Sequence, residues 1–117
     1  MDMNENIIVL KSRKFAIRIV NLYKYLSVEK KEFVLSKQLL RSGTSIGANV
    51  AEAEHGQTDA DFYSKMNIAL KEASETEYWI DLLHETDYIK DVEYNSIHTD
   101  VVELLKLLIS ITKKQKI

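Results

Sequence analysis

The chain has 117 residues, of which 45% are hydrophobic and 29% are charged, a length that fits one domain with a substantial buried core. It contains no proline, three glycines and no cysteine, which argues against a turn-rich all-β fold and excludes disulfides and cysteine-based metal or catalytic sites. The formal net charge of −2 argues against a general polyanion binder, because such binders neutralise phosphates with clustered cations.

The N-terminal segment holds one short apolar run, from Ile7 to Leu10. Such a run is too short for a signal peptide or a membrane span, so we expect a cytoplasmic protein that does not insert into membranes. The first helix is predicted over residues 8–26. Phe15, Ile19 and Leu22 recur in it at the spacing of a bundle helix with one broad apolar stripe.

The second helix is predicted over residues 32–55 and ends before Gly56, a natural helix terminator. Gly43 and Gly47 lie inside it, where each glycine costs roughly 1 kcal/mol against alanine. Two such glycines four residues apart suggest that another element approaches this backbone closely. A line of polar residues follows the same helix: Gln38, Ser42, Ser45, Asn49 and Glu52.

The third helix is predicted over residues 59–85, with Thr58 as its N-cap, and the fourth over residues 91–112. Short connections between consecutive helices make neighbours antiparallel. The sequence therefore predicts an all-α protein, folded as an antiparallel up-down-up-down four-helix bundle with a single domain.

The charges are distributed unevenly along the chain. Residues 1–45 carry nine Lys or Arg against four Asp or Glu, whereas residues 46–112 carry four against fourteen. The favoured interpretation is that basic and acidic helices attract each other within the bundle. The alternative is a basic face on the first helix that contacts nucleic acid through Lys11, Arg13, Lys14, Arg18 and Lys24.

A di-iron carboxylate centre is the sharpest enzyme hypothesis for a four-helix bundle, since it needs inward-facing Glu and Glu-x-x-His from different helices. Glu52-Ala-Glu-His55 has this spacing, and Asp81-Leu-Leu-His84 comes near it. The first helix, however, has no acidic residue between Leu10 and Leu26. We therefore favour solvated surface carboxylates, and we predict no catalytic residue, metal ligand or cofactor.

Glu72 and Glu75 lie on one face of the third helix, and we expect them to meet donors on the second helix, because buried polar groups need partners. The predicted structural polar network comprises Arg41, Ser42, Ser45, Asn49, Glu52, Glu72 and Glu75. Trp and Tyr are enriched at protein interfaces. A second apolar stripe on the third helix therefore predicts a subunit interface formed by Tyr63, Leu70, Tyr78 and Trp79, with a broad core as the alternative.

Three groups of residues form a recognisable pattern: Phe15-Ala16, then Gln38-Leu39, Arg41-Ser42, Ser45-Ile46, Asn49 and Ala51-Glu52, then Phe62, Leu70, Glu72-Ala73, Glu75 and Tyr78-Trp79. With this pattern the chain resembles, over about residues 10–112, the bacterial "four helix bundle protein" family, also called the 23S rRNA intervening-sequence protein family. The resemblance implies a four-helix subunit that assembles into a closed ring, with a pentamer as the expected state.

The same family includes the accessory protein of diversity-generating retroelements, a basic ring-shaped partner of a reverse transcriptase and its RNA. This chain differs from that branch because it is not basic. It also ends its second helix with Ala51-Glu52-Ala53-Glu54-His55-Gly56, where members usually end with Ala-Glu-Gly.

Together, these features predict a non-enzymatic, homo-oligomeric scaffold or accessory protein. Its expected partners are further copies of itself and a protein or ribonucleoprotein. An RNA- or DNA-binding accessory factor is the alternative, and a di-iron enzyme is the less favoured one.

Overall fold

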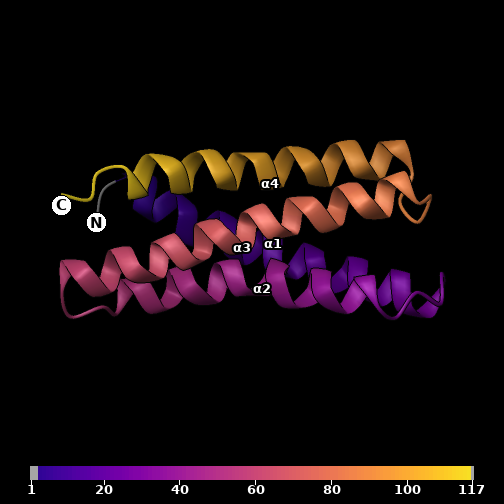
Figure 1. Ribbon diagram of the computed structural model, residues 1–117, viewed down its shortest axis with the longest axis horizontal. Coiled ribbons are helices and arrows are strands. Elements are labelled where there is room, and N and C mark those ends of the chain that lie inside the picture. The colour runs from indigo at the N-terminus through magenta and orange to yellow at the C-terminus, as the bar shows by residue number, and fades with distance from the viewer. Residues whose placement is uncertain (1–2, 117) are drawn as a thin grey trace.

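Four α-helices make up almost all of residues 3–116, the part of the chain that the computed structural model describes. They are α1 (Met3–Val28), α2 (Leu35–Glu54), α3 (Asp59–Glu85) and α4 (Asp91–Thr112). Figure 1 shows them running antiparallel, with both termini at one end of the bundle and the connections 29–34 and 86–90 at the other. We call the end that carries these two connections the distal end. The predicted all-α four-helix bundle is confirmed.

The helices pack in a cyclic order. α1 contacts α2, α2 contacts α3, α3 contacts α4, and α4 returns to α1. Consequently α1 and α3 occupy opposite corners, and the face formed by α1 and α4 lies across the bundle from the face formed by α2 and α3. The described residues extend over 44 × 22 × 21 Å.

The core forms where the apolar stripe of each helix turns inward. Its larger members are Ile8, Phe15, Ile19, Leu22, Leu26, Leu39, Ile46, Val50, Met66, Ile80, Leu83, Ile89, Ile97, Val101, Leu104, Leu108 and Ile111. Each fully buried side chain of this kind contributes about 1.5–3 kcal/mol relative to an exposed one. Within residues 3–116, no helix is both long and apolar enough to cross a membrane.

The bounds of α3 and α4 coincide with the expected ranges, whereas α1 and α2 differ from the predicted 8–26 and 32–55 at both ends. α1 starts at Met3 and not at residue 8, which allows the Asn4 amide to donate to the Ser110 hydroxyl of α4 at 3.3 Å. α2 starts at Leu35 because Glu32 stays outside the helix. The Glu32 carboxylate instead accepts backbone N–H bonds from Leu35 at 3.1 Å and from Ser36 at 2.7 Å.

Gly43 and Gly47 lie where α1 approaches α2. A Cβ atom at Gly43 would stand 2.8 Å from Cγ1 and Cγ2 of Ile19. A Cβ atom at Gly47 would stand 3.2 Å from the carbonyl oxygen of Ser12. The element that approaches these glycines is therefore α1.

Candidate functional site

Arg41 of α2 joins two carboxylates of α3. Its Nη1 atom donates to Oε2 of Glu72 at 3.1 Å, and its Nη2 atom donates to Oε2 of Glu75. The same oxygen of Glu75 accepts the indole N–H of Trp79 at 2.8 Å. Because one carboxylate serves both helices, this cluster fixes the register of α2 against α3 and orients the Trp79 ring.

The other residues of the predicted polar network do not join this cluster. The buried Ser42 hydroxyl accepts from the Thr76 hydroxyl at 2.9 Å, a partner that the sequence analysis missed. Glu52 pairs with Lys65 at 2.9 Å, about three turns along α2 from Arg41.

Ser45 and Asn49 bond within their own helix. The Ser45 hydroxyl donates to the carbonyl of Arg41 at 2.6 Å, and the Asn49 amide donates to the carbonyl of Ser45 at 2.9 Å. Such side chains are easily satisfied by a carbonyl one turn back, so a polar line on a helix need not form one network.

The four residues of the predicted subunit interface point in different directions. Tyr63, Leu70 and Glu77 follow one another at seven-residue intervals, so all three lie on the same side of α3. Oε2 of Glu77 lies 3.0 Å from Nε2 of His98 and accepts a hydrogen bond from it, which places this side of α3 next to α4. Trp79 turns toward α2 through its bond to Glu75.

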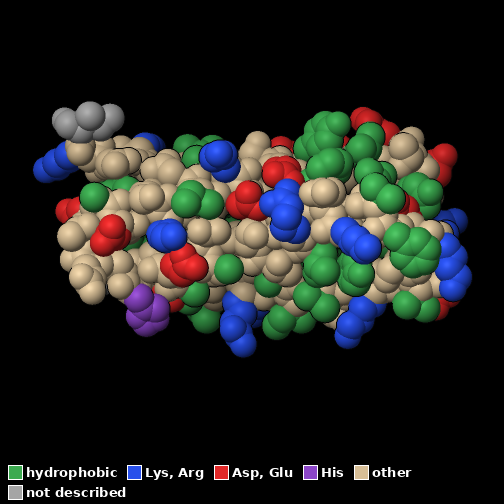
Figure 2. Space-filling model, turned by 60° about the horizontal axis from the view of Figure 1, so that its bottom comes forward, with side chains coloured by type: hydrophobic (Ala, Val, Ile, Leu, Met, Phe, Trp, Pro, Cys, Tyr) green, Lys and Arg blue, Asp and Glu red, His purple; other side chains and the backbone are tan. Residues whose placement is uncertain are grey.

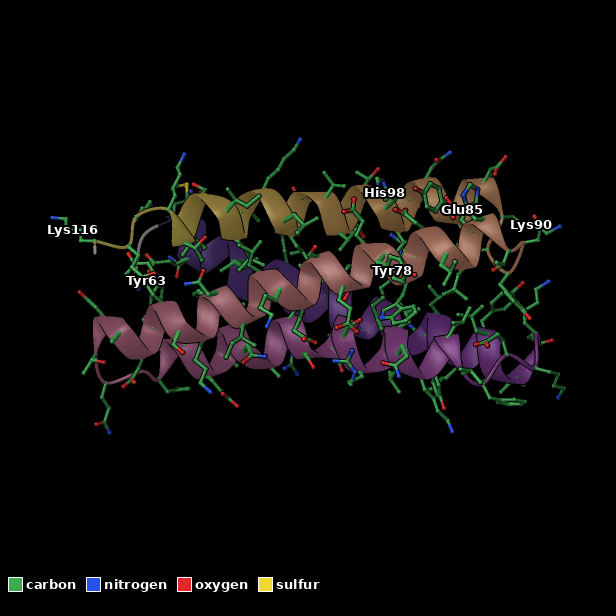
Figure 3. The ribbon with its side chains drawn as sticks, in the orientation of Figure 1. Tyr63, Tyr78, Glu85, Lys90, His98 and Lys116 are labelled. Carbon is green, nitrogen blue, oxygen red and sulfur yellow. The ribbon has the colours of Figure 1, made fainter. Side chains whose placement is uncertain are left out.

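Tyr78 alone of these four is strongly exposed, at 59%. Figure 3 shows it on the outer side of α3, in the half of the bundle that leads to Lys90. The rings of Tyr78 and Trp79 meet edge to face with centroids 5.0 Å apart. Tyr78 is therefore an outward aromatic group held beside a ring that the Arg41 cluster fixes.

Exposed apolar side chains gather at the distal end. Seen from the α2 side in Figure 2, hydrophobic side chains concentrate over the half of the molecule that lies away from the termini. The large exposed hydrophobic residues at this end are Tyr25, Val28, Phe33, Val34 and Val92, and Tyr78 of α3 and Ile17 of α1 lie about two to three turns from it. Clustered exposure of this kind marks interaction surfaces more often than scattered exposure does.

The five predicted phosphate-binding cations of α1 divide into two groups. Lys11 pairs with Glu103 of α4 at 3.0 Å, and Arg18 pairs with Asp100 at 2.8 Å and with Glu93 at 3.3 Å.

Arg13, Lys14 and Lys24 are exposed and form no ion pair within residues 3–116. The outer face of α1 that carries them also exposes the apolar side chains of Leu10 and Ile17, by 64% and 57%. The structure therefore leaves three of the five cations available on a partly apolar face.

A stack of three rings between α3 and α4 is the main polar feature that the sequence analysis missed. His84 and Tyr94 stack with centroids 3.9 Å apart, and Tyr94 and His98 stack at 5.1 Å. His84 pairs with Asp91 at 2.7 Å. Tyr94 and His98 are four residues apart, which places them on one side of α4, but their partners on α3 follow only from the three-dimensional register.

The phenol of Tyr94 has a raised pKa. Its hydroxyl donates to Oδ1 of Asp81 at 2.7 Å, and this bond, burial and the charges of Asp81, Glu77 and Glu85 raise the pKa of Tyr94 to about 12.

The two motifs of the di-iron hypothesis lie apart: Asp81 and His84 contact Tyr94 between α3 and α4, whereas the Glu52–His55 motif of α2 lies at the surface. Glu54 and His55 are exposed, and Glu52 is engaged with Lys65. Among the described residues 3–116, no three His, Asp or Glu side chains come close enough together to hold a metal ion. The Glu-x-x-His spacing thus occurs on an outward face of α2 and not on its core side.

The fold and these surfaces define a helical-bundle protein whose polar groups serve helix pairing and whose outward face carries aromatic side chains. The model of the 23S rRNA-intervening sequence protein family matches residues 4–110, and the chain belongs to that family. The resemblance predicted from the helix sequences is thereby confirmed.

One solved structure of high similarity is a protein of unknown function from the S23 ribosomal protein family of Bacteroides thetaiotaomicron VPI-5482. It shares 62% sequence identity with this chain, covers 95% of this chain and 99% of its own, and has a TM-score of 0.93. No curated protein matches the chain. The comparisons therefore establish the family and the fold.

Proposed function

We propose that the protein is a non-enzymatic, homo-oligomeric scaffold or accessory protein that acts in the cytoplasm. The observation that carries the proposal is the apolar surface of the distal end, with Tyr78 exposed by 59% beside Trp79. Aromatic residues are enriched in the buried centres of protein interfaces, where they provide much of the binding energy. A monomer gains nothing from exposing them, whereas a subunit contact removes them from water.

A closed ring of about five subunits is the assembly that we expect, as the family resemblance implies. Most soluble oligomers have closed symmetry, and a head-to-tail contact closes into a ring when its rotation permits. A protein or ribonucleoprotein partner would then bind the faces that the ring leaves free.

Sedimentation velocity of matched surface variants tests this proposal. Tyr78→Ser should reduce or abolish the oligomer, because it removes an exposed aromatic anchor without touching the core. The control is Ile109→Ser, since Ile109 has a similar exposure of 51% but lies near the terminal end of α4. If Tyr78→Ser and the wild type sediment alike, Tyr78 is not an interface residue, and an unassembled wild type would contradict the scaffold itself.

Nucleic-acid binding is a second candidate, favoured by the exposed cations Arg13, Lys14 and Lys24 on one side of α1. If these residues bind phosphates, affinity for RNA should fall steeply with added salt, because bound cations release counterions. Reversing the charge of Arg13 and Lys14 should then weaken binding. Reversing Lys65, which pairs with Glu52 on another face, serves as the control. Absence of binding at low salt would rule this candidate out.

A further inference from the structure

The connection between α1 and α2 exposes three apolar side chains at the distal end. Val28, the last residue of α1, is exposed by 60%, Phe33 by 53% and Val34 by 72%. Figure 1 shows this connection at the end of the bundle that lies away from the termini. Helix connections are ordinarily polar, and side chains this exposed add little to the core, so the fold does not account for them.

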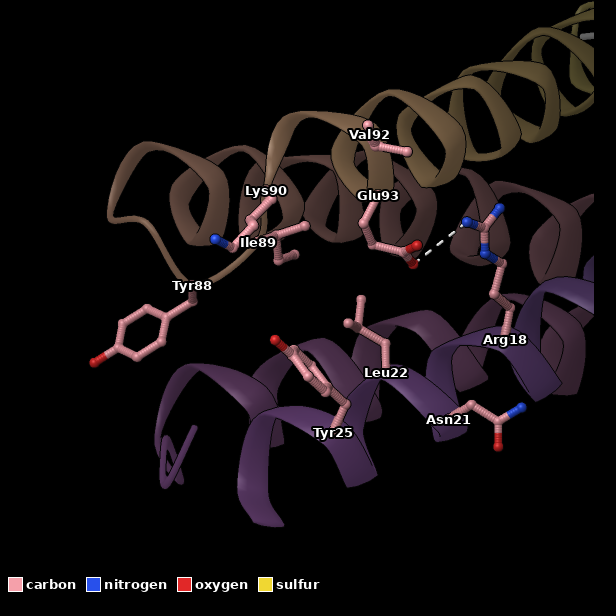
Figure 4. Close-up of a pocket in the computed structure, with 9 residues that line it drawn as sticks. All are labelled: Arg18, Asn21, Leu22, Tyr25, Tyr88, Ile89, Lys90, Val92 and Glu93. Carbon is pink, nitrogen blue, oxygen red and sulfur yellow. Dashed lines mark hydrogen bonds and ion pairs between the residues drawn. The ribbon is translucent and has the colours of Figure 1, made fainter. Parts of the chain in front are cut away.

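Cations flank these apolar side chains. Lys30, Lys31 and Lys37 are exposed, and none of them forms an ion pair within the described part of the chain. The Lys30 ammonium lies 5.9 Å from the centroid of the Tyr25 ring, which Figure 4 shows near the end of α1, where a groove opens toward α4. Lys37 lies in the first turn of α2, so cations stand on both the α1 and the α2 side of the connection.

The acidic side chains of the connection oppose this charge only weakly. Glu32 is buried, and its carboxylate turns inward to accept the backbone N–H groups of residues 34–36. Glu29 is the one exposed acidic side chain in residues 28–37, all of which the structure describes. The connection therefore presents an apolar tip within a surface of net positive charge.

The backbone of the connection is largely satisfied within the chain. The N–H groups of Glu29 and Lys30 donate to the carbonyl of Tyr25 at 2.9 and 3.3 Å, and that of Glu32 donates to the carbonyl of Leu26 at 3.0 Å. With the three bonds to the Glu32 carboxylate, six N–H groups of residues 29–36 are paired internally. Because an N–H group that is already bonded costs less to remove from water, the connection can enter a less polar medium.

We propose that the connection between α1 and α2 binds the surface of a membrane that contains anionic lipid. Val28, Phe33 and Val34 enter the headgroup region, while the lysines lie over the lipid phosphates. Burial of apolar side chains and attraction to anionic headgroups are the two contributions that hold a protein on a bilayer without spanning it. Such a contact needs no long apolar run, which is why the sequence analysis, judging by run length, expected no membrane partner.

The side chains favour lipid over RNA or a folded protein. Valine can neither stack on a base nor hydrogen-bond with it, so an RNA contact would leave Val28 and Val34 in water. A folded partner would need a cavity shaped to receive a convex connection, whereas lipid molecules rearrange around it. Apolar side chains flanked by lysines match the two layers of an anionic membrane surface, which are phosphate above hydrocarbon.

Vesicle flotation of the full chain tests the proposal. The protein should float with vesicles that contain phosphatidylglycerol and not with vesicles of phosphatidylcholine alone, and added salt should weaken the binding. Lys30→Glu combined with Lys31→Glu should weaken binding by about thirty-fold or more, because each basic residue near an anionic surface contributes about a factor of five.

The matched control combines Lys71→Glu with Lys106→Glu, the same change of charge at exposed positions of α3 and α4, and should bind nearly as the wild type does. Absence of flotation with phosphatidylglycerol, or equal flotation with both kinds of vesicle, would overturn the proposal. Equal losses in the two double variants would also overturn it, since binding would then follow net charge and not this connection.

The apolar side chains are tested separately. Val34→Ser changes a side chain that is 72% exposed at the N-cap of α2, where serine is favoured, so the variant should keep its helicity and bind anionic vesicles more weakly. Because the chain has no cysteine, Phe33→Cys can carry an environment-sensitive fluorophore, whose emission should shift to the blue on these vesicles. The same label on Ile109→Cys, in the half of α4 near the termini, should not shift.

A label at residue 33 that stays in water while the protein floats would show that another surface binds, and would overturn the proposal. RNA binding that the connection variants abolish, without flotation on either kind of vesicle, would assign the connection to nucleic acid instead. Subunit assembly is a separate matter, because Tyr78 lies along the side of the bundle and the connection at its end. An assembled protein that does not float contradicts only the membrane contact, and a monomer that floats contradicts only the assembly.

Discussion

The carboxylate of Glu32 shows how a single residue determines where a helix begins. It accepts backbone N–H bonds from Val34, Leu35 and Ser36, which are among the donors that the first turn of α2 cannot satisfy internally. Burial raises the pKa of the Glu32 carboxyl, but the backbone bonds from Ser36, Leu35 and Val34 lower it by more, so this pKa lies below its ordinary value of 4.5.

Glu32→Gln should therefore destabilise the protein at neutral pH, by about 1 kcal/mol, as the loss of an N-terminal helix cap does. A lowered folded-state pKa contributes stability that is present above the unfolded pKa and is lost as the pH falls through the folded pKa. The wild type and the variant should thus differ at neutral pH and converge in acid. Urea unfolding of the wild type and of Glu32→Gln at neutral and at acidic pH measures this difference in stability. Equal stability of the two proteins at neutral pH would contradict the prediction.

The raised pKa of Tyr94 predicts the opposite pH dependence of stability, at alkaline pH. Its folded-state pKa of about 12 lies above the ordinary value of 10, so its contribution to stability is present below pH 10 and is lost as the pH rises through about 12. Asp81→Asn should lower the pKa of Tyr94, because it removes the accepting carboxylate and its charge.

NMR titration of the Tyr94 ring checks this directly. Asp91→Asn is the matched control, because Asp91 pairs with His84 and does not accept the Tyr94 bond. An unchanged Tyr94 pKa in Asp81→Asn would show that the hydrogen bond is not its main cause.

At the scale of the helices, α1 and α2 approach each other through the two internal glycines of α2. Gly43 leaves room for the Ile19 side chain, and Gly47 leaves room for the backbone of Ser12. The intrinsic cost of glycine in a helix is offset here by close packing, and the Arg41 cluster fixes α2 on its other side against α3.

Gly43→Ala should destabilise the protein by about 1 kcal/mol, although alanine is the better helix former by about the same amount. The new Cβ would stand 2.8 Å from two atoms of Ile19, a β-branched side chain that cannot easily turn away. Gly47→Ala is the graded control and should be nearly neutral, since its closest contact would be 3.2 Å. Thermal unfolding measures both. A stabilised Gly43→Ala variant would mean that α1 moves aside without cost.

The helices themselves were predictable, because apolar residues such as Phe15, Ile19 and Leu22 recur at helical spacing and are the residues that fill the core. The contacts of the candidate site were less predictable from the sequence. Arg41, Glu72 and Glu75 were expected to interact and lie together, but Ser45 and Asn49 bond to their own helix, and no sequence pattern distinguishes these two outcomes. Tyr78 was correctly placed outside the core stripe, whereas the direction of Tyr63 and Leu70 toward α4 depends on how far α3 is rotated within the bundle.

For the whole molecule, the uneven charge of the sequence is partly neutralised inside the bundle. Lys11 and Arg18 of the basic segment pair with Glu103, Asp100 and Glu93 of the acidic segment. Within residues 3–116, Arg13, Lys14 and Lys24 stay unpaired on the outer face of α1, and exposed apolar side chains gather toward the distal end. We propose that further copies of the chain cover the part of this apolar surface that lies along the sides of the bundle.

The native mass of the purified protein, measured by light scattering at low and at moderate salt, tests this account most directly. We predict a closed assembly of several 13.5 kDa subunits, with five as the expected number. Because the contact is mainly apolar, the mass should be the same at both salt concentrations. A mass of 13.5 kDa at both would contradict the account, since the aromatic surface would then face water in the working protein.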